Sequence, residues 1–238
     1  MATTNLLYKS EVVINDFVTI KIPTVGEILE AEDEYYSLVS MLTSMPIDLM
    51  VFLDDLGIDF STINDYDLFI ILFHIMRQTD TKLVFGDLDL SKFEYAVDEA
   101  TGQAVYIDTR TDRKFDRALQ INIAETLRKI HHMEKNIKKP GNEEARKYMI
   151  ERARKKMKRN RRKKHDSQLE GLIVAMVNTE QYKYDFAGTQ ELTIYQFNEC
   201  VRQIVHKIDY SNKMFGVYSG ALSAKNLSQD ELNWLTHK

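Results

Sequence analysis

The residues with the most evident chemistry are cations in a run from residue 146 to residue 164. This run holds twelve Lys or Arg side chains in nineteen positions, opposed by one acid, Glu151. Positive charge at this density can bind the phosphates of a nucleic acid, dock on an acidic protein surface, or lie on a solvated helix that the rest of the chain neutralises. We take as the candidate partner-binding residues Arg152, Arg154, Lys155, Lys158, Arg159, Arg161 and Arg162.

The composition of this run favours nonspecific over sequence-specific binding of nucleic acid. Proteins that bind single strands stack the bases on aromatic side chains interleaved with cations, and Tyr148 is the one aromatic residue in the run. Nonspecific binding of phosphates, with a steep salt dependence, remains open. The first 100 residues would repel a nucleic acid, because they hold nineteen acids and five bases and have a net charge of −14.

The sequence lacks the common catalytic and metal-binding motifs. It contains no G-x-x-x-x-G-K-[ST] or G-x-G-x-x-G phosphate loop and no H-E-x-x-H zinc motif. His131 and His132 are adjacent, so on a helix they point about 100° apart and suit a shared metal poorly. We expect His74, in an apolar helix, to be a hydrogen-bonded core residue and Cys200 to be a packed thiol.

We therefore predict no catalytic residue, no cofactor and no metal, and a protein that is not an enzyme. The alternative of an active site assembled from positions far apart in the chain stays open.

Composition narrows the class of protein. With 238 residues and 44% hydrophobic content, the chain can form one large domain or two small ones. Cys200 is the single cysteine, which excludes an intrachain disulfide and favours a reducing compartment. The longest apolar run, Leu68 to Phe73, is far shorter than the roughly 18 residues of a membrane span, so no membrane is expected as a partner.

Hydrophobic spacing predicts the elements of the first half. Alternating apolar residues predict two short strands around a turn at Asn15-Asp16. Thr24 and Glu27 have the spacing of a capping box, which predicts a helix over about residues 24–43. Further helices are expected over residues 46–57, 64–76 and 115–132, with a hairpin or small sheet over 81–110. The acids near Gly57 lack the order of a calcium loop and predict a solvated turn: Asp54, Asp55 and Asp59.

Pro140-Gly141 is the clearest break in the chain, and it predicts a boundary between two lobes. Residues 1–139 form an acidic, mostly helical lobe with small β elements, and residues 140–238 form a helical lobe. The second lobe starts with the basic helix, 146–164, which is expected to project into solvent beyond a thin apolar stripe of Tyr148, Met149, Ala153 and Met157. Helices are also expected over residues 166–177, 193–208 and 228–235, the last docked through Trp234. The predicted fold class is mainly α with minor β, that is α+β.

Two stretches of the chain resemble proteins encoded by phages of Gram-positive bacteria. The first stretch contains IPTVGEIL at residues 22–29, Tyr35-Tyr36, TSMP at 43–46 and LGID at 56–59. The second contains YKYDF at 182–186, LTIYQF at 192–197, GVYSG at 216–220 and LNWL at 232–235. A Lys/Arg-rich helix lies between the two, as in the proteins they resemble. This pattern is similar to the phage tail assembly chaperone and tail morphogenesis family.

The resemblance implies a noncatalytic tail assembly chaperone or tail-associated structural protein that binds tape-measure or tail-tube subunits. It implies the host bacterial cytoplasm as the place of action, and it leaves open both retention in the virion and formation of a homo-oligomer. No active-site residues come with it. The alternative is a nucleic-acid-binding phage protein that uses the basic helix at residues 146–164.

Overall fold

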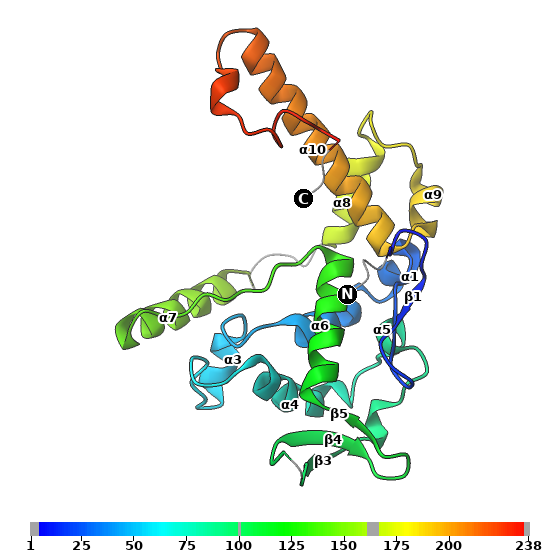
Figure 1. Cartoon of the computed structure of the whole chain (residues 1–238), viewed down its shortest axis with the longest axis vertical. Coiled ribbons are helices and arrows are strands. Elements are labelled where there is room, and N and C mark those ends of the chain that lie inside the picture. The colour runs from blue at the N-terminus through cyan, green and yellow to red at the C-terminus, as the bar shows by residue number, and fades with distance from the viewer. Residues whose placement is uncertain (1–4, 100, 161–166, 236–238) are drawn as a thin grey trace.

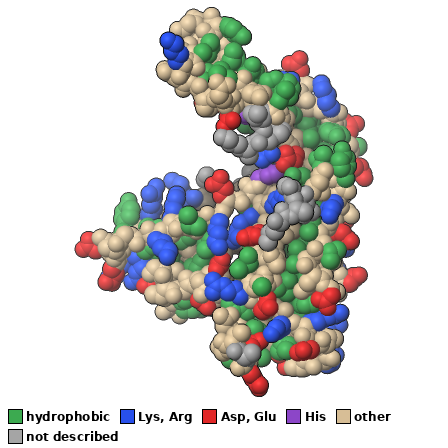
Figure 2. Space-filling model, viewed as in Figure 1, with side chains coloured by type: hydrophobic (Ala, Val, Ile, Leu, Met, Phe, Trp, Pro, Cys, Tyr) green, Lys and Arg blue, Asp and Glu red, His purple; other side chains and the backbone are tan. Residues whose placement is uncertain are grey.

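The computed structural model describes residues 5–99, 101–160 and 167–235. It confirms an α+β protein that is 54% helical, with antiparallel sheets of two and three strands. Figure 1 shows a body from which two helices project, α7 (Glu143–Asn160) and α10 (Ile194–Tyr218). Figure 2 shows the same two projections with their side chains.

The body is built from the first half of the chain and a few later elements. The first half contains β1 (Glu11–Val13), β2 (Thr19–Lys21), α1 (Val25–Glu30), α2 (Glu32–Thr43), α3 (Met50–Asp55), α4 (Asp65–Met76), α5 (Lys82–Phe85), η1 (Leu90–Lys92), β3 (Glu94–Val97), β4 (Ala104–Asp108), β5 (Arg113–Phe115) and α6 (Arg117–His131). The second half contains α7, α8 (Gln168–Val177), α9 (Phe186–Glu191), α10 and η2 (Ala224–Asn226).

The hairpin of β1 and β2 confirms the predicted turn. Val12 pairs with Ile20 in antiparallel register, and Ile20 is fully buried. Asn15 closes the turn because its side-chain oxygen accepts hydrogen bonds from the N–H groups of Phe17 and Val18, at 3.1 and 2.7 Å.

The helix expected over residues 24–43 is two helices, α1 and α2. The predicted capping box is present, since the N–H of Thr24 donates to Glu27 at 2.7 Å and the N–H of Glu27 donates to Thr24 at 3.2 Å. The chain leaves the helical conformation at Ala31, where φ is −146° and ψ is 47°. The acids that follow, Glu32 and Asp33 among them, favour a new helix N-terminus at this point.

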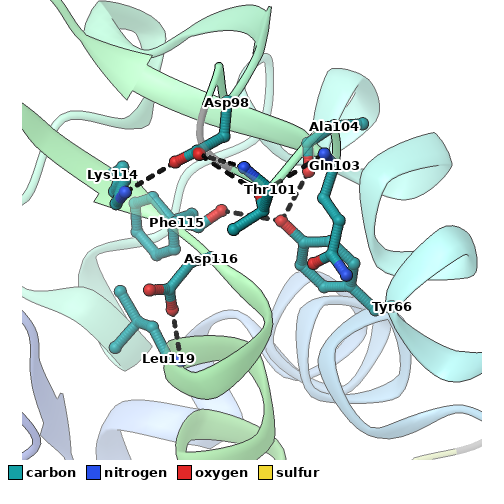
Figure 3. Close-up of polar contacts among 9 residues, drawn as sticks. All are labelled: Tyr66, Asp98, Thr101, Gln103, Ala104, Lys114, Phe115, Asp116 and Leu119. Carbon is teal, nitrogen blue, oxygen red and sulfur yellow. Dashed lines mark hydrogen bonds and ion pairs between the residues drawn. The ribbon is translucent and has the colours of Figure 1, made fainter.

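One tyrosine of α4 holds the three-stranded sheet, whose order is β3-β4-β5 (Figure 3). The hydroxyl of Tyr66 donates to the carbonyl of Ala104 at 2.7 Å and lies 3.2 Å from the carbonyl of Phe115. Asp98 and Lys114 form an ion pair at 2.7 Å between the hairpin and β5. The hydrogen bond from Lys114 lowers the pKa of Asp98 to about 2.

The prediction of a helix from residue 115 is wrong at its start, where the structure has strand β5. The ring of Phe115 lies 5.0 Å from that of Phe73 and 4.9 Å from that of Phe93, so the strand places it in an aromatic cluster. α6 begins two residues later, because the carboxylate of Asp116 accepts a hydrogen bond from the N–H of Leu119 at 2.8 Å.

A single set of packed apolar residues runs from Leu6 to Phe197. Segments far apart in sequence meet in it, since Thr24 pairs with Thr193 in an antiparallel bridge. Phe197 is the last buried residue in the described part of the chain. The lobe boundary at residue 140 stays a prediction, and residues on both sides of it share this core.

Three further local predictions are wrong. Residues Lys82–Phe85, expected in a hairpin or small sheet, form helix α5. His74 is exposed, because the buried face of α4 passes through Leu72, Phe73 and Met76 instead. Residues 228–235 form turns and not a helix, although the N–H of Ser228 donates to Glu231 at 2.9 Å as a cap would.

Candidate partner-binding surfaces

The basic helix α7 starts as the sequence predicts. Asn142 precedes it, and the side-chain oxygen of Asn142 accepts a hydrogen bond from the N–H of Ala145 at 2.7 Å. Glu143 and Glu144 occupy the first turn, where negative charge suits the helix dipole. The described helix ends at Asn160, so the candidates Arg161 and Arg162 lie outside the described residues.

The apolar stripe of α7 differs from the predicted one. Met149 and Ala153 are half-buried, but Tyr148 and Met157 are exposed. The buried residue is Ile150, because α7 turns this face toward α3. The stripe is therefore an anchor to the body at the N-terminal half of the helix.

Three acids, two in the last turn of α3 and one just after it, bind this helix. Arg154 of α7 lies 2.6 Å from Asp54 and 2.5 Å from Asp55, and Arg146 lies 3.0 Å from Asp59. The hydrogen bonds that the guanidinium of Arg154 donates to the two carboxylates raise its pKa. These acids, predicted to form a solvated turn, lie in part in α3 and hold α7 on the body, and Arg154 is engaged within the chain.

A basic groove lies beside the anchored part of α7. Its volume is about 810 Å³, and its lining residues are Met50, Lys138, Met149, Arg152, Ala153, Lys155, Lys156 and Arg159. Figure 2 shows Lys and Arg side chains gathered over α7. We call this feature the basic groove.

The basic groove contains three of the seven candidate cations and two that the sequence analysis missed. Arg152, Lys155 and Arg159 were candidates, whereas Lys138 and Lys156 were not. Lys138 reaches the groove from the segment before the Pro140-Gly141 break, and its position in sequence gives no sign of this. Lys158, also a candidate, is exposed on α7 and is not a lining residue.

Most of these cations are available to a partner. Lys155 pairs with Glu151 at 2.6 Å. Within the described residues, the side chains of Lys138, Arg152, Lys156 and Arg159 form no ion pair. Cations around a surface that includes methionine side chains can hold an anionic partner that also offers apolar atoms.

The second projecting helix, α10, presents apolar side chains. Its first turn is buried, with Ile194 and Phe197 in the core. Farther along, the exposed side chains include Val205, Phe215 and Tyr218. Large apolar side chains exposed on a projecting helix favour an interaction site.

The two adjacent histidines face different partners. The Nε2 atom of His131 lies 2.9 Å from the hydroxyl of Tyr35, and burial lowers the pKa of His131 to about 4. His132 faces Glu199 of α10 instead. In the described part of the chain, no group of three or more His, Cys, Asp or Glu residues could hold a metal ion.

Cys200 is half-buried on α10, and burial raises the pKa of its thiol. Among the described helices, none combines the length and the apolar character needed to cross a membrane.

The geometry defines a helical protein whose two projecting helices present a basic and an apolar surface. Residues 160–238, which include α8, α9 and α10, match the family model of the YomV second domain, a Bacillus phage-derived family. This match fits a phage protein. No curated protein and no solved structure matches the chain.

Proposed function

We propose that this chain is a noncatalytic phage tail morphogenesis protein, a tail assembly chaperone or tail-associated structural protein that binds tape-measure or tail-tube subunits. The observation that carries the proposal is the pair of projecting helices, α7 and α10, which offer surface to another macromolecule. The phage-derived family match of residues 160–238 and the sequence resemblance support it.

A tape-measure protein poses the physical problem that such a helper would solve. It is a long, largely helical chain, and it exposes apolar stripes before the tail tube surrounds it. Exposed apolar surface aggregates at cellular concentrations, so a helper that covers those stripes keeps the chain available for assembly. In this proposal the basic groove attracts acidic stretches of the partner and speeds the encounter. The place of action is the host bacterial cytoplasm.

Coexpression with the tape-measure and tail-tube proteins of the same phage tests the proposal. We expect one of them to copurify with this chain. Replacing three groove cations, in the variant Arg152→Glu/Lys156→Glu/Arg159→Glu, should weaken the complex by at least about tenfold, since buried or close charge pairs contribute one or more kcal/mol each.

The matched control changes three exposed lysines outside the groove, Lys9→Glu/Lys183→Glu/Lys225→Glu. It alters the net charge by the same amount and should leave the complex intact. Failure of both tail proteins to copurify, or equal losses in the two variants, would count against the proposal.

A second candidate function is nonspecific nucleic-acid binding, favoured by the four groove cations that have no ion pair among the described residues. Binding to generic duplex DNA, titrated with salt, distinguishes it. If phosphates are the ligand, affinity falls steeply with salt and the triple groove variant reduces the slope by about three. Weak binding at about 150 mM salt that the variant does not change would exclude this function.

A further inference from the structure

The apolar residues of α10 follow the seven-residue spacing of a coiled coil. Steps of three and four residues connect Ile194, Phe197, Val201, Ile204, Ile208, Ser211, Phe215 and Tyr218. In this set only Ser211 is not apolar. A repeat of alternating three and four places these side chains on one seam of the helix, where a second helix can pack. We call this set the α10 seam.

The seam leaves the core partway along the helix. Ile194 and Phe197 are buried, and Val201 and Ile204 are half-buried. Beyond them the exposed fraction is 39% for Ile208, 75% for Phe215 and 82% for Tyr218. In the described chain the side chains that continue the same pattern are therefore open to solvent, most of all Phe215 and Tyr218.

The C-terminal segment covers a different face of α10. The side chain of Gln203 donates to the carbonyl of Trp234 at 3.0 Å, and Lys213 lies 2.9 Å from Glu231. Lys207 lies 5.3 Å from the centre of the Trp234 ring. With 100° of rotation per residue, Gln203 and Lys213 lie about 140° from Ile208 around the helix, and Lys207 lies about 100° from it, at the edge of the seam. In Figure 1 this segment runs along one side of α10.

The residues on either side of the seam indicate which kind of partner helix can bind it. In a coiled coil, charges at these flanking positions set the choice of partner. Here the flanking positions from residue 200 to 219 hold Cys200, Val205, Lys207, Asn212, Met214 and Ser219, so Lys207 is the one charged residue. A charged partner helix would find little to pair with, whereas an identical helix brings one flanking charge, Lys207, which already lies over the Trp234 ring of its own chain.

We propose that the α10 seam binds a second copy of this chain, forming a homodimer through Ile208, Phe215 and Tyr218. A twofold interface uses the same patch on both partners, and an uncharged apolar seam is complementary to itself. The inference is separate from the proposed function, because it assigns the α10 seam to a second copy and leaves the basic groove of α7 to the tail subunits.

The size of the seam sets the expected strength of the dimer. Two copies contribute four aromatic rings, each able to bury about 150 Å², which gives roughly 600 Å². Val205 and Ile208 of both copies add less than this, since Ile208 is only 39% exposed, so the interface falls short of the roughly 1,200 Å² found in the smallest stable interfaces. We therefore expect a dimer with a dissociation constant in the range of about 1 to 100 µM.

Sedimentation equilibrium and light scattering over about 1 to 500 µM of the full chain test this inference. The average mass should rise from monomer toward dimer across the range. The variant Ile208→Asp/Phe215→Asp places charges in the seam and should stay monomeric throughout. The control variant Tyr148→Asp/Val174→Asp changes two exposed apolar residues on other helices, where the exposed fractions are 63% and 46%, and should dimerise as the native chain does.

A cysteine probe gives a second measurement without charges in the seam. In a Cys200→Ser background, Ser211→Cys places one thiol on the seam, and a short bismaleimide should link two chains. Asp16→Cys in the same background, on the β1–β2 turn, should not link. Three results would overturn the inference: a monomer at every concentration, a dimer that survives the double aspartate variant, or a monomer whose seam binds a tape-measure or tail-tube subunit instead.

Discussion

At the scale of single residues, the hydroxyl of Tyr66 connects α4 to two strands. The side chain is buried, and its proton serves the carbonyls of Ala104 and Phe115. Tyr66→Phe keeps the ring and leaves both carbonyls without this donor, which should lower the free energy of unfolding by about 1 to 3 kcal/mol. Chemical denaturation measures it. The same change at Tyr95, which is exposed on β3, should cost less than about 0.5 kcal/mol, and equal losses at the two positions would contradict the assignment.

His131 makes stability depend on pH. Burial lowers its pKa to about 4 in the folded chain, against about 6.5 in the unfolded chain. Between these values the unfolded chain binds a proton that the folded chain does not, so the free energy of unfolding falls as the pH drops from about 6.5 to 4, by up to about 3 kcal/mol. Below pH 4 this contribution no longer changes.

The variant His131→Gln tests this pH dependence, because an amide oxygen can still accept from Tyr35 but cannot titrate. Urea unfolding at several pH values should show a shallower fall for this variant than for the native chain. His74→Gln changes an exposed histidine and should leave the slope as it is. Parallel curves for the native chain and His131→Gln would show that His131 is not the responsible group.

At the scale of elements, α7 depends on one buried side chain and a few ion pairs. Surface ion pairs contribute about 0 to 1 kcal/mol each, so Ile150 should be the main anchor. Ile150→Ala should destabilise the docking of α7 by about 2 kcal/mol, seen as faster hydrogen exchange over residues 143–160 with little change in the body. Tyr148→Ala, at an exposed position of the same helix, should leave the exchange rates unchanged.

The elements show what spacing can and cannot predict. Capping residues at Thr24, Asn64 and Thr193 fix helix starts locally, and these starts were predicted. Strand β5 has three residues, which are too few to show an alternation of apolar and polar side chains. It is held by long-range contacts, among them the packing of Phe115 against Phe73 in the aromatic cluster. The contact between α7 and the acids of α3 joins residues about a hundred positions apart, which no local pattern can indicate.

At the scale of the whole molecule, the shared core should make the two predicted lobes unfold together. The bridge between Thr24 and Thr193 and the carboxylate of Glu32, which accepts from the N–H of Leu169 at 3.1 Å, connect the early and late parts of the chain. We expect one cooperative transition by calorimetry, with the calorimetric enthalpy equal to the van't Hoff enthalpy. Two resolved transitions would show that the lobes are independent.

The two candidate partner-binding surfaces, on α7 and α10, could be predicted in part from the sequence. The density of cations pointed to the helix, but the fold decides which of them a partner can reach, since Arg154 is held by Asp54 and Asp55 and Lys138 joins from another segment. The seam of α10 is visible in the sequence as an amphipathic pattern. The exposure of the seam cannot be predicted from this pattern, because it depends on the buried core ending at Phe197 in the folded chain.

That end point has an evolutionary consequence. Among the described residues, those after Phe197 contribute no buried side chain, so selection can act there on recognition with little penalty in folding. The last forty or so positions, which lie within the match to the YomV second-domain model, can therefore vary in their exposed side chains while the core is kept. Exchanging that tail between homologues should transfer binding preference and leave the melting temperature of the recipient nearly constant.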